Sequence, residues 1–447
     1  MTSRPVIPVR TASGKPSADA LAQMDKRWRV RYLMLAPHRL GFFLAMVVLV
    51  ASGLWWALVQ LDRSTAWVGL HYAVSSTLVH SAVMAFGFIP LFFSGFLFTA
   101  GPKWLGVEPL PVQALRVPLV SQAAGWLLWL AGAHWHAGVA WAGLALACAG
   151  LVWMTVQFWG RIRLSQAQDR IHARVIGAAC VVGCVSVAGL WLSLVFDAHA
   201  AARAWVFTGL WGFVVVVYVT VAHRMIPFFT SSAMPLVQAW RPFWVLWLML
   251  AAAALQVLAA WLELAGVPAS AAGSAAGTTW LLVHGTLQLV VGGVLVWLAW
   301  VWGLVQSLKN KLLAMLHIGF LWLGVAYLLG GLSQWLAGTL GIGVLGLGAL
   351  HALTMGCLAS LMLAMVTRVS CGHSGRALVA DRIAWSLFWC LQAAAVLRIA
   401  ASVPGIAGLP LPWLLPLAAV LWAATLGAWG LRLGRWYGRL RADGRPG

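Results

Sequence analysis

The sequence is poor in charge, and acidic residues are the scarcest part of it. Only 9% of the 447 residues are Asp, Glu, Lys or Arg, whereas a soluble globular protein has roughly 25%. Together with a hydrophobic content of 62%, this scarcity excludes a disordered chain, a coiled coil and an ordinary water-soluble enzyme. Only nine residues are acidic, which argues against a proton-coupled carrier built on buried carboxylates.

Cysteine motifs are also missing. The six cysteines form no CxxC or CxxCH pattern. Covalent attachment of a c-type haem, a thiolate zinc site and a disulfide framework are therefore not expected. Cys180 and Cys184 lie one helical turn apart in an apolar run, which is typical of packing inside a membrane helix.

Long apolar runs dominate what is present. A membrane-spanning helix needs about 20 apolar residues. Twelve runs meet this requirement, at residues 40–61, 76–100, 117–133, 138–159, 174–196, 204–226, 243–265, 278–303, 312–337, 341–367, 383–403 and 411–431. They predict an all-α polytopic membrane domain over residues 39–433, with the glycine-rich stretch 338–348 opening the tenth helix. A basic, disordered cytoplasmic tail (1–38) and a short basic cytoplasmic tail (434–447) flank the domain.

The positive charges test this division of the chain. If the amino terminus is cytoplasmic, 26 of the 29 Lys and Arg residues fall on the cytoplasmic side, and only Arg63, Arg203 and Arg398 fall outside. This alternation predicts that both termini are cytoplasmic in a bacterial inner membrane. The net charge of +20 is then explained by the lipid bilayer and its anionic leaflet, and nucleic acid is not an expected partner.

Histidine is the main polar residue inside the predicted helices. His80, His284 and His351 lie on the second, eighth and tenth helices, all of which run inward from the outer surface. Each lies roughly 6–15 Å deep at 1.5 Å per residue. Neutral imidazole is a common ligand of haem and metals, so three imidazoles at similar depth indicate a cofactor site. The alternative is that each histidine packs and hydrogen-bonds to a neighbouring helix.

Two methionines and an arginine extend this candidate site. Met84 and Met355 follow His80 and His351 by four residues, which places each on the same face of an α-helix as its histidine. Thioether sulfur can bind copper or haem iron, although methionine is also ordinary packing material. Arg398, inside the outer end of the eleventh helix, needs an anion, either a haem propionate or a phospholipid headgroup.

Three segments of the chain resemble the NnrS family of bacterial membrane proteins. They are HSAVMAFGFIPLFFSGFLFTAGPKWLG (80–106), HRMIPFFT (223–230) and HALTMGCLASLMLAMVTRVSCGHSGRAL (351–378). The resemblance implies a haem- and copper-containing inner-membrane protein of the response to nitric oxide and nitrosative stress. It also implies a remote similarity to the catalytic subunits of haem–copper oxidases and nitric oxide reductases.

In those subunits, haem-ligating histidines come from helices 2 and 10. His80 and His351 occupy these helices here, so we expect them to be the axial ligands of one b-type haem. His284 would then bind a second haem or copper, or donate a hydrogen bond beside the first haem. Ala82 and Val83 stand where the family's second-helix motif has His and Glu, so any copper or proton-delivery function of those two residues is lost or moved.

The resulting hypothesis is a haem-binding protein of nitric oxide metabolism with a redox or gas-binding role, possessing a membrane redox partner or assembling as a homo-oligomer. The alternatives are a transporter of a metal, haem or a nitrosylated small molecule, and a structural partner of another membrane complex. The cytoplasmic loop 371–382 is a separate candidate. Arg368, His373 and Arg376 in and beside it could bind an anion or dock a partner, or the loop is only a helix-terminating turn.

Overall fold

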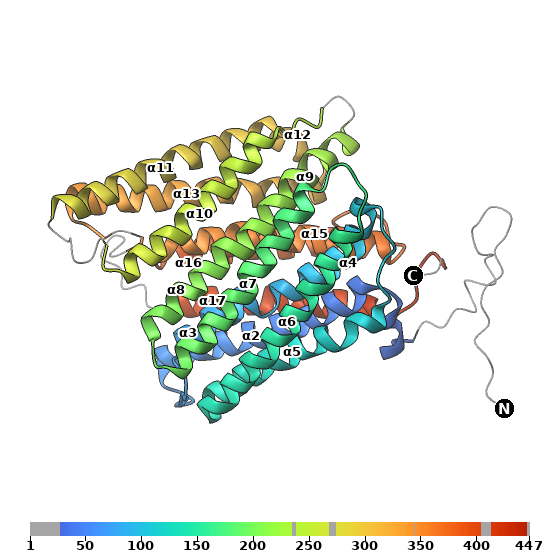
Figure 1. Ribbon diagram of the computed structural model, residues 1–447, viewed down its shortest axis with the longest axis horizontal. Helices are drawn as coiled ribbons and strands as arrows, with labels where there is room; N and C mark the ends of the chain where they lie inside the picture. Colours follow the sequence, from blue (N-terminus) through green and yellow to red (C-terminus); the bar gives the residue numbers. More distant parts are fainter. Residues whose placement is uncertain (1–26, 235–237, 268–273, 344, 404–412, 445–447) are drawn as a thin grey trace.

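The computed structural model describes residues 27–234, 238–267, 274–343, 345–403 and 413–444, which are helical with connecting loops (Figure 1). Twelve of the described helices are long and apolar enough to cross a membrane. The prediction of an all-α polytopic protein with twelve spans is therefore confirmed. The predicted amino-terminal tail lies outside the described residues up to residue 26, and residues 30–35 of it form a short 3₁₀ helix.

Nine of the spans are single helices and three are composite. The elements in chain order are η1 (Val30–Leu35), α2 (Pro37–Thr65), α3 (Ser76–Phe86), α4 (Ile89–Leu105), α5 (Val112–Trp135), α6 (Ala137–Leu164), α7 (Ile171–Val195), α8 (His199–Gly209), η2 (Leu210–Val215), α9 (Val216–Ala233), α10 (Phe243–Leu264), α11 (Ala275–Val301), α12 (Leu304–Ser307), α13 (Lys311–Leu340), α14 (Gly348–His351), η4 (Ala352–Leu358), α15 (Ala359–His373), α16 (Arg382–Ala400) and α17 (Leu414–Tyr437). The composite spans are α3–α4, α8–η2–α9 and α14–η4–α15.

The glycine-rich stretch does not open the tenth helix, so that expectation was wrong. The ninth span, α13, continues to Leu340, and Gly341 ends it in the left-handed conformation with φ of 66°. Leu345 and Gly346 also have positive φ, so the backbone turns there and the next helix begins at Gly348. A glycine directly after the last helical residue is a common helix stop, because only glycine adopts this conformation at little cost.

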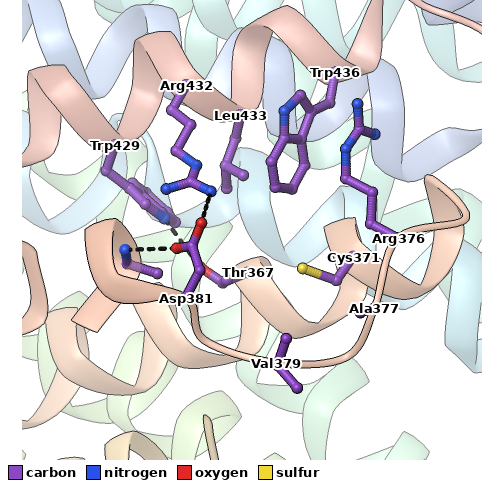
Figure 2. Close-up of a pocket in the computed structure, with 11 residues that line it drawn as sticks. Thr367, Cys371, Arg376, Ala377, Val379, Asp381, Trp429, Arg432, Leu433 and Trp436 are labelled. Carbon is purple, nitrogen blue, oxygen red and sulfur yellow. Dashed lines mark hydrogen bonds and ion pairs between the residues drawn. The ribbon is translucent and has the colours of Figure 1, made fainter. Parts of the chain in front are cut away.

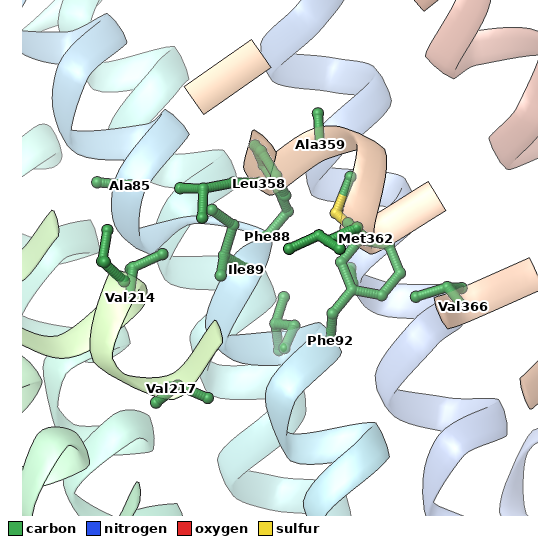
Figure 3. Packing of buried hydrophobic residues seen from close by; sticks show 14 of the residues in the cluster. Ala85, Phe88, Ile89, Phe92, Val214, Val217, Leu358, Ala359, Met362 and Val366 are labelled. Atoms are coloured by element: carbon green, nitrogen blue, oxygen red, sulfur yellow. The ribbon is translucent and has the colours of Figure 1, made fainter. Parts of the chain in front are cut away.

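The composite spans depart from α-helical geometry near the middle of the bundle. The second span breaks at Gly87 and Phe88, just before Pro90, while η2 and η4 are π-helical segments of the sixth and tenth spans. Figure 3 shows side chains of all three spans packed together, with Ile89 beside Leu358. Because π-helical turns occur frequently at functional sites, this part of the bundle is where a site is expected.

The two ends of the membrane domain meet. α2 packs against α17, and the buried Arg39 side chain donates hydrogen bonds to the carbonyl oxygens of Tyr437 and Arg439, at 3.2 and 2.6 Å. Both described ends therefore lie on one side of the bundle (Figure 1), as an even number of spans requires. We call this side the terminal face and the other side the opposite face.

Candidate functional site

Two of the histidines predicted to bind a cofactor lie together near the opposite face. His80 is the fifth residue of α3, and His351 is the last residue of α14, directly before the π-helical segment η4. Both side chains are half-buried, and the two imidazoles lie close enough for their charges to interact. The structure therefore places these two residues near each other, His80 as the fifth residue of its span and His351 as the fourth of its own.

A hydrogen bond fixes the tautomer of His351. Its Nδ1 lies 2.8 Å from the carbonyl oxygen of Leu347, one turn earlier in the chain. A carbonyl oxygen only accepts, so Nδ1 carries the proton and donates, and Nε2 keeps its lone pair. This is the arrangement by which proteins orient a histidine that binds a metal through Nε2.

His80 is held by an aromatic ring instead. Its imidazole stacks on Trp56 of α2, with ring centroids 3.8 Å apart and planes inclined by only 16°. Its Nδ1 is buried and has no hydrogen-bond partner among the described residues. No hydrogen bond among the described residues fixes the tautomer of His80, so either ring nitrogen is free to bind a ligand.

Two arginines flank this pair. Arg398 of α16 donates a 2.6 Å hydrogen bond to Ser402 and interacts electrostatically with both histidines. Arg63, at the end of α2, donates to Ser76 at 2.8 Å and also acts on His80. The described part of the chain supplies no carboxylate that forms an ion pair with either guanidinium. The site thus combines two imidazoles with two arginines that have no ion-pair partner among the described residues.

The sequence did not indicate that Arg63 belongs to this site. The charge count had already set it apart, together with Arg203 and Arg398, as one of three outer cations. Arg203 forms an ion pair with Glu263, at 3.1 Å, so it needs no other anion. The sequence did not show that Arg63 lies near His80. The loop between α2 and α3 places the start of α3, the helix that carries His80, beside Arg63.

The third predicted histidine is held by two glutamines. His284, the tenth residue of α11, is buried, and its Nε2 lies 3.1 Å from Nε2 of Gln288 and 3.3 Å from Nε2 of Gln256. A Cβ built on Gly330 of α13 would lie within 4 Å of both Gln288 and Ala349, so the glutamine that pairs with His284 approaches the helical turn that ends at His351. The glutamine amides hold the ring as a hydrogen-bonded group between α10, α11 and α13.

Each methionine lies on nearly the same helix face as the histidine four residues before it. His80 and Met84 both lie in α3, so α-helical spacing puts them on one face. Met355 follows His351 by four residues into the π-helical segment η4, and a spacing of four residues keeps the two on nearly the same face in a π-helical turn as well. Met355 is buried, whereas Met84 is half-buried.

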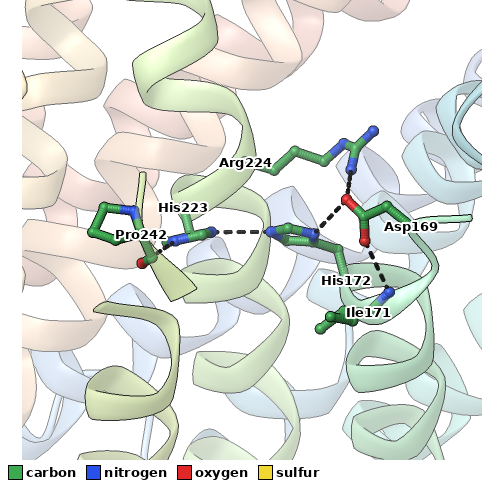
Figure 4. A network of polar contacts seen from close by, with 6 residues as sticks. All are labelled: Asp169, Ile171, His172, His223, Arg224 and Pro242. Carbon is green, nitrogen blue, oxygen red and sulfur yellow. Dashed lines mark hydrogen bonds and ion pairs between the residues drawn. The ribbon is translucent and has the colours of Figure 1, made fainter. Parts of the chain in front are cut away.

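Other histidines connect helices nearer the terminal face. The most extended network was not anticipated from the sequence: His172 Nε2 lies 3.0 Å from His223 Nδ1, and His223 Nε2 lies 3.1 Å from the carbonyl oxygen of Pro242 (Figure 4). Because that carbonyl oxygen accepts, His223 donates through Nε2, and its Nδ1 accepts a hydrogen bond from Nε2 of His172. Asp169, 4.0 Å from His172 Nδ1, closes the network at the protein surface.

Two further contacts belong to the same half of the bundle. His317 pairs with Thr230 at 2.9 Å, and His38 faces His373 with ring centroids 4.4 Å apart. Over the described ranges, no group of three or more His, Cys, Asp or Glu side chains has the geometry of a metal site. The expectation of copper is not tested by this result and stays a prediction.

By its fold and site, the chain is a helical membrane protein with twelve spans and a pair of imidazoles flanked by arginines in one half of the bundle. The model of the NnrS family, described as "NnrS protein", matches residues 32–441, and the chain belongs to this family. The resemblance seen in the three sequence segments is thereby confirmed. No curated protein matches the chain. Family membership supports a membrane protein of the nitric oxide response.

Proposed function

We propose that this protein binds one b-type haem through His80 and His351 and serves nitric oxide metabolism and protection from nitrosative stress in the bacterial inner membrane. The observation that carries the proposal is the imidazole pair, in which Leu347 fixes His351 with Nε2 available. Two neutral imidazoles are a suitable ligand set for haem iron. When bound, haem supplies one-electron transfer or binding of a diatomic gas.

The arginines support haem more than a bare metal ion. Two guanidinium groups beside a metal cation would repel it, whereas a b-type haem carries two propionate carboxylates. Arg63 and Arg398 each supply a fork of donors that suits a carboxylate. They lie near the opposite face, which the charge count predicts to be periplasmic, so the propionates would point toward water and the apolar macrocycle toward the bundle.

The surrounding residues have supporting roles in this proposal. Trp56 holds the ring plane of His80 by stacking, and Leu347 holds that of His351 by a hydrogen bond. Both devices orient a ligand before the haem binds, which reduces the conformational entropy lost on binding. A π-helical turn directly follows His351, and such turns occur frequently at functional sites.

The experiment is an absorption spectrum of the full chain, purified in detergent without added haem, followed by quantification of the haem as its pyridine complex. The proposal expects about one haem b per chain and narrow α and β bands on reduction, which are typical of two imidazole ligands. Copper is measured in the same sample. A folded but colourless protein would contradict the proposal and favour a transporter.

Nitric oxide titration of the reduced protein separates the two proposed roles. A spectral change on addition of nitric oxide indicates gas binding, in which one axial histidine is displaced. A spectrum that does not respond to nitric oxide, but whose reduction is reversible, indicates electron transfer to a partner. The same titration on His284→Ala shows whether the hydrogen-bonded histidine of α11 takes part in gas binding.

A further inference from the structure

A pocket at the terminal face is unrelated to the histidine pair. It has a volume of about 240 Å³ and lies between α15, α16, α17 and the loop that joins α15 to α16 (Figure 2). Arg376 of that loop and Arg432 of α17 lie on either side of the indole of Trp436, with guanidinium carbons 4.3 and 5.5 Å from the ring centroid. The volume corresponds to roughly eight water molecules, which suits a small headgroup.

One of the two arginines is partly neutralised. Asp381 caps the amino terminus of α16 and forms an ion pair with Arg432, whose hydrogen bond holds the pKa of that carboxyl below its ordinary value. The carboxylate is therefore ionised at neutral pH and satisfies one side of the guanidinium. The other side is not satisfied: Nη1 of Arg432 is buried without a hydrogen-bond partner among the described residues.

Arg376 has no counter-ion. None of the acidic side chains in the described ranges forms an ion pair with it, its guanidinium lies over the Trp436 ring, and the cations Arg432 and Arg439 are near enough to interact with its charge. Burial lowers the pKa of Arg376, and those cations lower it further. A half-buried guanidinium surrounded by like charge is costly, and an anion in the pocket would remove that cost.

The other basic residues of this loop region have different contacts. Arg368 lies 4.0 Å over the ring of Phe229, and His373 faces His38. Of the three residues that the sequence offered for an anion site in this loop, only Arg376 lines the pocket. The second arginine of the pocket, Arg432 of α17, was not predicted from the sequence. Trp429 and Trp436 also line the pocket, and tryptophan is enriched where a membrane meets water.

We propose that this pocket binds a phosphate group, presented by an anionic lipid headgroup or as free phosphate, on Arg376 and on Nη1 of Arg432. Guanidinium donors match phosphate oxygens, and basic pockets between transmembrane helices on the cytoplasmic side bind lipid phosphates. The charge count places this face on the cytoplasmic side, where the leaflet is anionic. The proposal is independent of haem binding.

The test uses the full chain in detergent, with dioleoylphosphatidylglycerol and inorganic phosphate as separate probes. Native mass spectrometry measures retention of the lipid against dioleoylphosphatidylcholine, and calorimetry measures binding of inorganic phosphate. The variant is Arg376→Gln, and the matched control is Arg435→Gln, which removes an exposed charge from the same end of α17. Loss of one charge-assisted hydrogen bond predicts about tenfold weaker binding for Arg376→Gln and none for the control.

The two probes identify the source of the phosphate. A response to the lipid alone assigns the pocket to a headgroup, and a response to inorganic phosphate assigns it to the free anion. The proposal is overturned if neither probe distinguishes wild type from Arg376→Gln, or if Arg435→Gln weakens binding equally. If Arg376→Gln does not fold, Arg376→Lys replaces it, because that variant keeps the charge and loses the fork of donors.

Discussion

Gly356 is the position where the packing around the tenth span is tested most sharply. It lies in η4, five residues after His351, and a Cβ added there would lie 2.6 Å from Cδ2 of Trp322. Ordinary contacts of such a carbon are 3.4–4 Å, so the indole or the π-helical turn must move by about 1 Å. Gly356→Ala therefore changes both the stability of the bundle and the position of the segment that carries His351.

The size of the destabilisation depends on the hydrogen bonds that the Trp322 indole supports. Trp322 donates a 2.8 Å hydrogen bond to Gln392, which in turn donates a 2.8 Å hydrogen bond to Ser360, so the three side chains link α13, α16 and α15. Overpacking costs about 1–3 kcal/mol, and a lost internal hydrogen bond about 1 kcal/mol. Gly356→Ala should destabilise the protein by about 2–4 kcal/mol, a fall of several degrees in melting temperature.

The assay is thermal unfolding in detergent, followed by tryptophan fluorescence, with the absorption spectrum recorded on the same samples. The matched control is Gly293→Ala in α11, where an added Cβ meets no atom within 4 Å. The control should be as stable as wild type, and Trp322→Phe should restore part of the loss in a double variant. If Gly356→Ala has the same melting temperature as the control, the packing described around η4 is wrong.

Three further predictions concern the site and the topology. Arg63→Gln or Arg398→Gln should lower the midpoint potential of the haem on the order of 50 mV, because removal of a nearby cation favours the ferric state. Potentiometric titration measures this potential. An unchanged potential in both variants would show that neither arginine lies beside the haem. His284→Ala should retain the low-spin haem but alter nitric oxide binding or metal content, and identical haem, copper and nitric oxide titrations would reduce it to a packed core residue. Reporters fused to Met1 and Gly447 should both give cytoplasmic signals, and a periplasmic signal at either end would contradict the predicted orientation.

The sequence was sufficient for the number of spans because hydropathy and basic loops act along the chain. The same reasoning gave the depth of His80 and His351, since depth depends only on where a helix begins. Hydropathy says nothing of which helices are neighbours. That is why the approach of Gln288 to the helical turn before His351, and the position of Arg63 beside the start of α3, became visible only in three dimensions.

Local backbone geometry was the second feature that the sequence did not predict. The glycines after Leu340 were expected inside a helix because small residues favour close helix packing, yet Gly341 ends α13 instead. The π-helical segment after His351 has no sequence signal comparable to a glycine stop, so the sequence did not predict it. Hydrogen bonds such as that between His172 and His223 depend on side chains from different spans, so the sequence could not pair them.

The central claim is that His80 and His351 are the two axial ligands of one haem. The most direct measurement is the reduced absorption spectrum of His80→Ala and His351→Ala beside wild type, each purified from the membrane fraction. The account predicts that the narrow α and β bands of the low-spin haem disappear in both variants while both proteins remain inserted in the membrane. An unchanged reduced spectrum in His80→Ala would contradict the assignment and make His284 the next candidate.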